Sequence, residues 1–246
     1  MNSVRILQLL SEAERHTQLI QGKDIIAFFG STGSGKSTTV NYFIGEELEL
    51  IDNDFGDKVV RLKQSNEKCA RIGQSIGTSE TIFSEGLEFK EDMADPEDEI
   101  YPKLQKTVLC DNPGFHDTRG SDYEICTNMS IDQAMKSTNT IRAVVLVMPY
   151  ETFTLDRANP VVAILELMQE RFPDILTKHE KSFYIIITKC TNEEKKGEAF
   201  ENRLTQHVRE EQEQIKKMTQ SDPSNITLDF LKERMKIFKA LQRMND

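Results

Sequence analysis

The stretch DIIAFFGSTGSGKSTTVNYFIGEE, residues 24–47, decides the fold of this chain of 246 residues. It opens on a continuous apolar run over residues 25–29, which predicts a buried strand. Glycines and serines follow, and residues 37–45 have the pattern of a helix closed by a glycine. A plain turn joining a strand to a helix would account for the glycines. Their fixed spacing from Lys36 indicates a more specific structure.

Residues 30–37, GSTGSGKS, match the pattern G-x-x-x-x-G-K-[ST] at every fixed position, between a predicted strand and a predicted helix. Glycines let the backbone curl around an anion so that amide N–H groups point inward, and the helix N-terminus adds partial positive charge. Lys36 is expected to reach the β- and γ-phosphates, and Ser37 to bind the Mg²⁺ that bridges them. The sequence therefore predicts a nucleoside triphosphate site and leaves the base open.

A second motif, DNPG at residues 111–114, lies at the end of the apolar run KTVLCDNPGF, residues 106–115. It resembles the D-x-x-G of P-loop GTPases, in which the aspartate holds Mg²⁺ through water and the glycine amide senses the γ-phosphate. The resemblance implies these roles for Asp111 and Gly114. The tetrapeptide alone is common in turns, so its position after a predicted strand is what gives it weight.

The segment RIGQSIGTSETIFSEGLEF, residues 71–89, lies between the two motifs and is expected to present a threonine to the metal. Thr78 and Thr81 are the candidates, with Ser79 as a further alternative, and an ordinary loop rich in serine and threonine would look similar. Thr81 is favoured because an apolar, strand-like run begins directly after it. The predicted metal ligands are Ser37, Thr81 and Asp111.

The rest of the chain predicts an α/β fold of the doubly wound class, with a mostly parallel sheet and helices on both faces. Continuous apolar runs alternate with helical patterns near 123–136 and 156–171; the runs are residues 25–29, 106–115, 141–149 and 182–190. Residues 46–105 are expected to be largely irregular. They include weak strand candidates at 58–62 and 81–89 and an exposed acidic loop at 90–99.

Three domains are expected: an N-terminal helix over 1–23 packed on the core, a nucleotide-binding domain over 24–191, and a charged helical extension over 192–246. The extension ends in an apolar stripe at helical spacing, formed by Leu228, Leu231, Met235, Phe238 and Leu241. Such a stripe usually packs on the core, and a partner is the alternative.

Composition excludes several classes of function. The net charge of −10 argues against broad binding of nucleic acid, which needs clustered basic residues. The four cysteines and four histidines show no metal-ligand spacing. No run approaches the length of a membrane helix and the N-terminus does not read as a signal peptide, so an intracellular, cytoplasmic protein is expected.

The chain resembles the translation-factor-related P-loop GTPases on their septin-like side, which includes septins, immune-associated nucleotide-binding GTPases and chloroplast import-receptor GTPases. The likeness lies in GSTGSGKSTTVNYFIGEE, where S/T-T-x-N-x-x-x-G follows the phosphate loop, and in DNPGF and IIITK. It implies a P-loop NTPase fold, or G domain, that binds GTP or GDP with Mg²⁺ and acts as a switch, with a homodimer or protein partner at the switch face or terminal helix. The implied nucleotide-binding residues are Gly30, Ser31, Thr32, Gly33, Ser34, Gly35, Lys36, Ser37, Thr38, Thr188 and Lys189.

Two departures from the GTPase pattern bear on activity. Thr191 stands where the base-reading [N/T]-K-x-D motif has its aspartate, and Phe115 stands where small GTPases have a glutamine that orients water. Slow hydrolysis is expected, with Lys36, Thr81, Gly114, His116 and Arg119 as the candidate catalytic residues, or with a group supplied in trans. Two alternatives remain: a pseudo-GTPase that presents a protein-interaction surface, and an ATP-using enzyme of the same fold.

Overall fold

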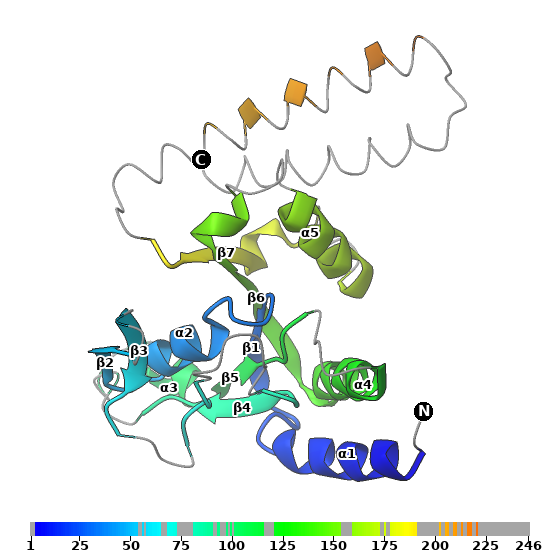
Figure 1. Ribbon diagram of the computed structural model, residues 1–246. Coiled ribbons are helices and arrows are strands. Elements are labelled where there is room, and N and C mark those ends of the chain that lie inside the picture. Colours follow the sequence, from blue (N-terminus) through cyan, green and yellow to red (C-terminus); the bar gives the residue numbers. More distant parts are fainter. Residues whose placement is uncertain are drawn as a thin grey trace. The chain divides into compact units, whose positions relative to one another are not determined.

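The computed structural model describes residues 3–53, 56, 58–64, 68–72, 81–90, 93, 97, 99, 101–115, 121–153, 159–172, 175 and 178–190, with helical positions at 202, 205, 206, 209, 210, 213, 216, 217 and 220. Figure 1 shows the elements in chain order. They are α1 (Ser3–His16), β1 (Asp24–Phe29), α2 (Lys36–Phe43), β2 (Leu48–Asp52), β3 (Lys58–Leu62), β4 (Glu85–Glu88), α3 (Tyr101–Leu104), β5 (Thr107–Asp111), α4 (Ser121–Ser137), β6 (Thr140–Pro149), the 3-10 helix η2 (Tyr150–Phe153), α5 (Asn159–Arg171), the 3-10 helix η4 (Glu180–Ser182) and β7 (Phe183–Thr188).

A five-stranded sheet with the order β4-β5-β1-β6-β7 forms the centre of the fold (Figure 1). Strand β1 is parallel to both of its neighbours, with Ala27 opposite Cys110 of β5 and Val144 of β6, whereas β4 runs antiparallel to β5. Strands β4 and β5 therefore lie on one side of β1, and β6 and β7 lie on the other side. In open α/β sheets a ligand site forms at such a switch point, outside the carboxyl ends of the strands.

The sheet is covered by helices, as its apolar strands require. On one face, Val40 of α2 and Ile44, directly after this helix, pack with Phe28, Leu109 and Val147 in a buried cluster. On the other, the turn after α1 covers β4: a side chain at Gly86 would stand 2.9 Å from Ile20 and 3.1 Å from Val108. Helix α1 packs against α4, with Leu9 and Ala13 buried beside Cys126. The α/β class and the mostly parallel sheet are therefore confirmed.

The predicted strands and helices differ from the observed ones mainly at their ends. All four long apolar runs are strands, and the weak candidate at 58–62 is β3. Over 81–89 only residues 85–88 form a strand. Strand β2 lies where irregular structure was expected, paired antiparallel with β3 in a separate two-stranded sheet. Its sequence LELID gives no clear strand pattern, because it is short and carries charge at Glu49 and Asp52.

Two compact units make up the chain. The first comprises Met1–Met148 and Tyr184–Ile186, and the second comprises Pro149–Phe183 and Ile187–Asp246. Within the second unit α5 packs against η2. The described positions between 202 and 220 are helical, as predicted, whereas the apolar stripe of residues 228–241 lies outside the described residues. In the part of the chain that the structure describes, every helix is too short or too polar to cross a membrane.

Candidate functional site

The loop between β1 and α2 follows the carboxyl end of the central strand. Gly30 is buried with φ of 150°, and a side chain there would stand 2.2 Å from the carbonyl oxygen of Val147 in β6. The Ser34 amide closes a turn onto the Ser31 carbonyl oxygen (3.1 Å), and Gly35 caps the start of α2. The glycine pattern therefore brings the backbone of the loop close to that of β6, directly in front of the N-terminus of α2, where an anion is favoured.

Lys36 lies under this loop with only 6% of its surface exposed. Its Nζ donates to the carbonyl oxygens of Gly30 (3.1 Å) and Ser31 (3.2 Å). Burial lowers the pKa of Lys36, and the Asp111 carboxyl opposes that effect. An ammonium group has three donors, so these two bonds hold it in place and leave one donor for a ligand.

Ser37, Thr81 and Asp111, the three predicted metal ligands, come together from separate parts of the chain. The Ser37 hydroxyl of α2 donates to Asp111 Oδ2 at the end of β5 (2.6 Å). The Thr81 hydroxyl lies 3.3 Å from Ser37 Oγ and donates to the same carboxylate oxygen (3.5 Å). These contacts span 30 to 74 residues of sequence, so the tertiary fold assembles the cluster.

The cluster brings together oxygen atoms of the kind that Mg²⁺ takes as ligands. Mg²⁺ takes oxygen ligands, commonly one or two carboxylates together with substrate phosphates. Among the described residues, Asp111 Oδ1 and Thr32 Oγ1 are buried polar atoms without a hydrogen-bond partner. No set of three His, Cys, Asp or Glu side chains in the described ranges could hold a metal. The two hydroxyls and the carboxylate could serve as ligands of a Mg²⁺ ion that a phosphate also binds.

Asp111 is fully buried, and desolvation is the main reason that its pKa rises to about 6. Lys36 and the bonds from Ser37 and Thr81 lower that pKa, and the charge of Glu85 raises it. The surroundings thus stabilise the carboxylate only in part. A buried carboxyl group whose charge is only partly compensated is suited to bind a cation.

This burial predicts a pH dependence of stability. Because the pKa of Asp111 is about 6 in the fold against 3.8 ordinarily, the native state holds the proton more tightly than the unfolded chain. The resulting stabilisation is complete below the unfolded pKa and disappears as pH rises through about 6. We expect the free energy of unfolding to fall by on the order of 3 kcal/mol between pH 4 and pH 7 because of Asp111. Urea denaturation of wild type and Asp111→Asn across this range would measure it; parallel profiles would contradict the expectation.

The DNPG motif packs against the phosphate loop. The Phe115 amide donates to the Gly30 carbonyl oxygen (3.1 Å), and the Thr32 amide donates to the Phe115 carbonyl oxygen (3.5 Å). A side chain at Gly114 would stand 2.6 Å from the Thr32 nitrogen, so only glycine fits. The Phe115 ring stacks on Phe29 with centroids 6.0 Å apart. Gly114 therefore lies where an amide could reach a phosphate bound by the loop, while Phe115 contributes apolar packing.

A buried polar network behind the motif was not predicted. Asn112 donates from Nδ2 to the Phe28 carbonyl oxygen (3.0 Å) and accepts a hydrogen bond from the Ser84 hydroxyl (2.7 Å). The Ser84 amide in turn donates to Ser130 Oγ of α4 (3.0 Å). All three side chains are fully buried. Sequence reasoning could have singled out Asn112 only as an amide at the end of an apolar strand.

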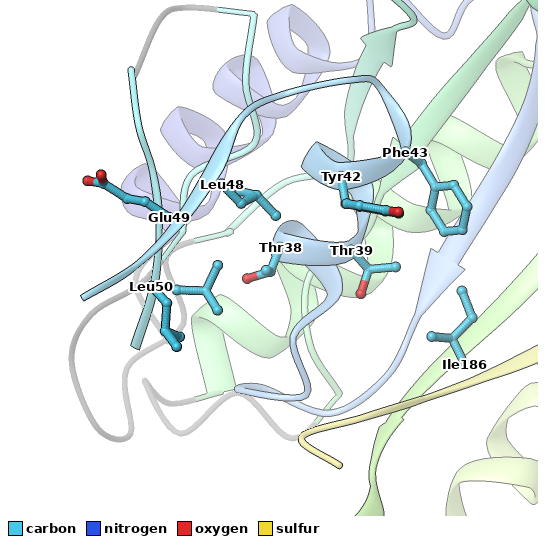
Figure 2. A pocket seen from close by; sticks show the side chains of 9 residues that line it. Thr38, Thr39, Tyr42, Phe43, Leu48, Glu49, Leu50 and Ile186 are labelled. Carbon is cyan, nitrogen blue, oxygen red and sulfur yellow. The ribbon is translucent and has the colours of Figure 1, made fainter. Parts of the chain in front are cut away.

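A groove of about 480 Å³ lies beside α2, between that helix, the β2–β3 hairpin and β7 (Figure 2). Figure 2 shows Tyr42 and Phe43 on one side and Leu48 and Leu50 on the other. Its lining is mainly apolar and includes no lysine or arginine side chain, so the groove offers no positive charge to a phosphate. Thr38, one of the predicted nucleotide-binding residues, lines this groove.

The remaining predicted residues divide into two groups. Thr188 ends β7 and Lys189 follows it with φ of 55°, and both belong to the second compact unit. The second group lies outside the described residues and comprises Thr78, Ser79, His116, Arg119 and Thr191. The structure therefore brings together the phosphate and metal residues of the prediction.

Comparisons with known proteins do not assign the chain to a family. No protein-family model matches the sequence, and no curated protein matches it. The α/β fold and the cluster around Lys36 and Asp111 are accordingly the basis for assigning a function.

Proposed function

We propose that this protein is a P-loop GTPase, a switch that binds GTP with Mg²⁺ and hydrolyses it slowly. The observation that carries the proposal is the convergence of Ser37, Thr81 and Asp111 next to a buried Lys36, at the carboxyl end of the central strand. The glycine loop supplies amides for the phosphates, Lys36 supplies charge, and the hydroxyls and carboxylate hold the metal. Bound Mg²⁺ would neutralise charge on the β- and γ-phosphates.

Guanine is proposed as the base because the chain resembles septin-like GTPases in strand β7, which ends at Thr188, and in Lys189 directly after it. The positive φ of Lys189 supports a special role for this turn, because a lysine adopts such a conformation only at some cost. ATP is the competing nucleotide, since Thr191 occupies the position of the base-reading aspartate.

Slow hydrolysis is proposed because of the position of Phe115. Its apolar ring is packed on Phe29 and has no group that could orient an attacking water. The backbone of Phe115 is held by hydrogen bonds with Gly30 and Thr32. Catalysis would therefore rely on Lys36, the metal and groups outside the described residues, with His116 and Arg119 as candidates, or on a group from a partner.

Magnesium-dependent binding tests the proposal. Ser37→Ala is expected to weaken GTP binding in Mg²⁺ by about fivefold, the equivalent of one hydrogen bond of about 1 kcal/mol, because the variant loses a metal ligand. In EDTA the variant and wild type are expected to bind equally. Titration of fluorescent GTP under both conditions would measure this. Ser137→Ala, which removes a serine hydroxyl bonded within α4, is the matched control.

Nucleotide competition and a measurement of phosphate release separate the alternative functions. Competition with unlabelled ATP as strong as with GTP would favour an ATP-using enzyme. Binding without any release of phosphate would favour a pseudo-GTPase. Wild-type protein that binds neither nucleotide in Mg²⁺ would overturn the proposal.

A further inference from the structure

The side chain of Asn112 lies where the carboxyl ends of β1 and β5 meet. Its Nδ2 donates to the Phe28 carbonyl oxygen of β1 (3.0 Å), and its Oδ1 accepts from the Ser84 hydroxyl (2.7 Å). Asn112 and Ser84 are both fully buried. Because a buried amide costs free energy unless its polar atoms are bonded, these two bonds hold the Asn112 side chain in one orientation.

The bond between Ser84 and Asn112 continues the antiparallel pairing of β4 with β5. In that pairing Glu85 lies opposite Asp111. One residue further along this register, Ser84 comes opposite Asn112, and their side chains are joined by the hydrogen bond. The residue before β4 is therefore held in register with the residue after β5, directly beside the candidate metal ligand Asp111.

The chain between Ser84 and the candidate ligand Thr81 is short and packed. Only Ile82 and Phe83 separate these two residues, and both pack in the apolar cluster that α1 and α4 share. The Ser84 amide also donates to Ser130 Oγ of α4 (3.0 Å). Thr81 is therefore three residues away from a point that both apolar packing and hydrogen bonds fix in place.

We propose that the hydrogen bond from Ser84 to Asn112 is a positioning contact that holds Thr81 at the candidate metal cluster. The Thr81 hydroxyl lies 3.3 Å from Ser37 Oγ and 3.5 Å from Asp111 Oδ2. This inference rests on the proposed function, in which Thr81 is a metal ligand. Fixing the segment beforehand lowers the entropy that is lost when Thr81 binds the metal. Ser84 therefore contributes to the part of GTP affinity that depends on Mg²⁺.

The GTP affinity of Ser84→Ala in Mg²⁺ and in EDTA tests this role. The variant removes the donor to Asn112 and keeps the backbone bond to Ser130. We expect the enhancement of affinity by Mg²⁺ to fall roughly three- to fivefold, the effect of one lost hydrogen bond, while affinity in EDTA stays within about twofold of wild type. Ser137→Ala, which removes a serine hydroxyl bonded within α4, is the control. A lower melting temperature with an unchanged ratio of the two affinities would show a purely structural role and overturn the inference.

A double-mutant cycle tests whether Ser84 acts through Thr81. In a Thr81→Ala background, Ser84→Ala is expected to cause no further loss of the Mg²⁺ enhancement, because the ligand that it positions is gone. Equal losses in both backgrounds would overturn the inference. Should Ser84→Ala fail to fold, Ser84→Cys carries the same comparison, because a thiol is a much weaker hydrogen-bond donor. Wild-type protein that binds no nucleotide would instead refute the proposed function.

Discussion

Replacing Lys36 with alanine is expected to weaken GTP binding by roughly 10- to 150-fold, the largest effect of any single change at the site. A hydrogen bond to a charged group contributes about 1.5–3 kcal/mol, which corresponds to that range of affinity. Two backbone carbonyl oxygens hold the Lys36 ammonium next to the loop. A bound phosphate therefore interacts with the positive charge of Lys36 without the entropic cost of ordering a flexible side chain.

Isothermal titration with GTP in Mg²⁺ would measure the loss. Lys63→Ala is the control, since Lys63 is an exposed lysine paired with Glu47 on the β2–β3 hairpin. Lys36→Met separates charge from packing because it keeps an apolar stem of similar length. Wild-type affinity in both Lys36 variants would show that the glycine loop does not bind phosphate.

Gly30→Ala is expected to destabilise the protein by about 2–6 kcal/mol, the largest predicted effect on folding. The new methyl group would stand 2.2 Å from the Val147 carbonyl oxygen and 2.9 Å from the Ser34 hydroxyl. Overpacking of this kind costs about 1–3 kcal/mol, and the positive φ of 150° adds backbone strain of about 1–3 kcal/mol. The overlap involves backbone of β6, which cannot move without disturbing the sheet.

The matched variant is Gly33→Ala in the same loop. Gly33 also has a positive φ, but a methyl group there meets nothing within 4 Å. We expect a loss of about 1 kcal/mol from the backbone alone. Urea denaturation of the three proteins would give the comparison. Equal losses in the two variants would contradict the role assigned to the contact between Gly30 and Val147.

The site could be predicted only in part, and the reason lies in how its residues are arranged in sequence. Gly30, Lys36 and Ser37 occur in one contiguous motif whose chemistry depends on local backbone geometry. The motif therefore identifies them from the sequence alone. Thr81 had to be chosen among neighbours by its position before an apolar run. Its contacts with Ser37 and Asp111 support that choice.

Other features left little trace in the sequence. In the sequence, Asn41 is only one position of the pattern S/T-T-x-N-x-x-x-G. Its hydrogen bonds to Ala70 join residues 29 positions apart. Strand β2 has no clear sequence pattern because its residues are partly exposed and charged, and its pairing with β3 holds it in place. Such features depend on partners that are distant in sequence, which local propensity does not encode.

The sequence by itself determined the α/β class and the strand, loop and helix around residues 24–47, because apolar periodicity and glycine spacing act over a few neighbouring residues. Only the tertiary structure decided that β1 lies between β5 and β6, that Asp111 reaches Ser37, and that Gly114 touches the loop at Thr32. The physical reason is that parallel strands pair through long crossovers, so the order of the sheet and the meeting of side chains at its carboxyl edge follow from packing the whole chain.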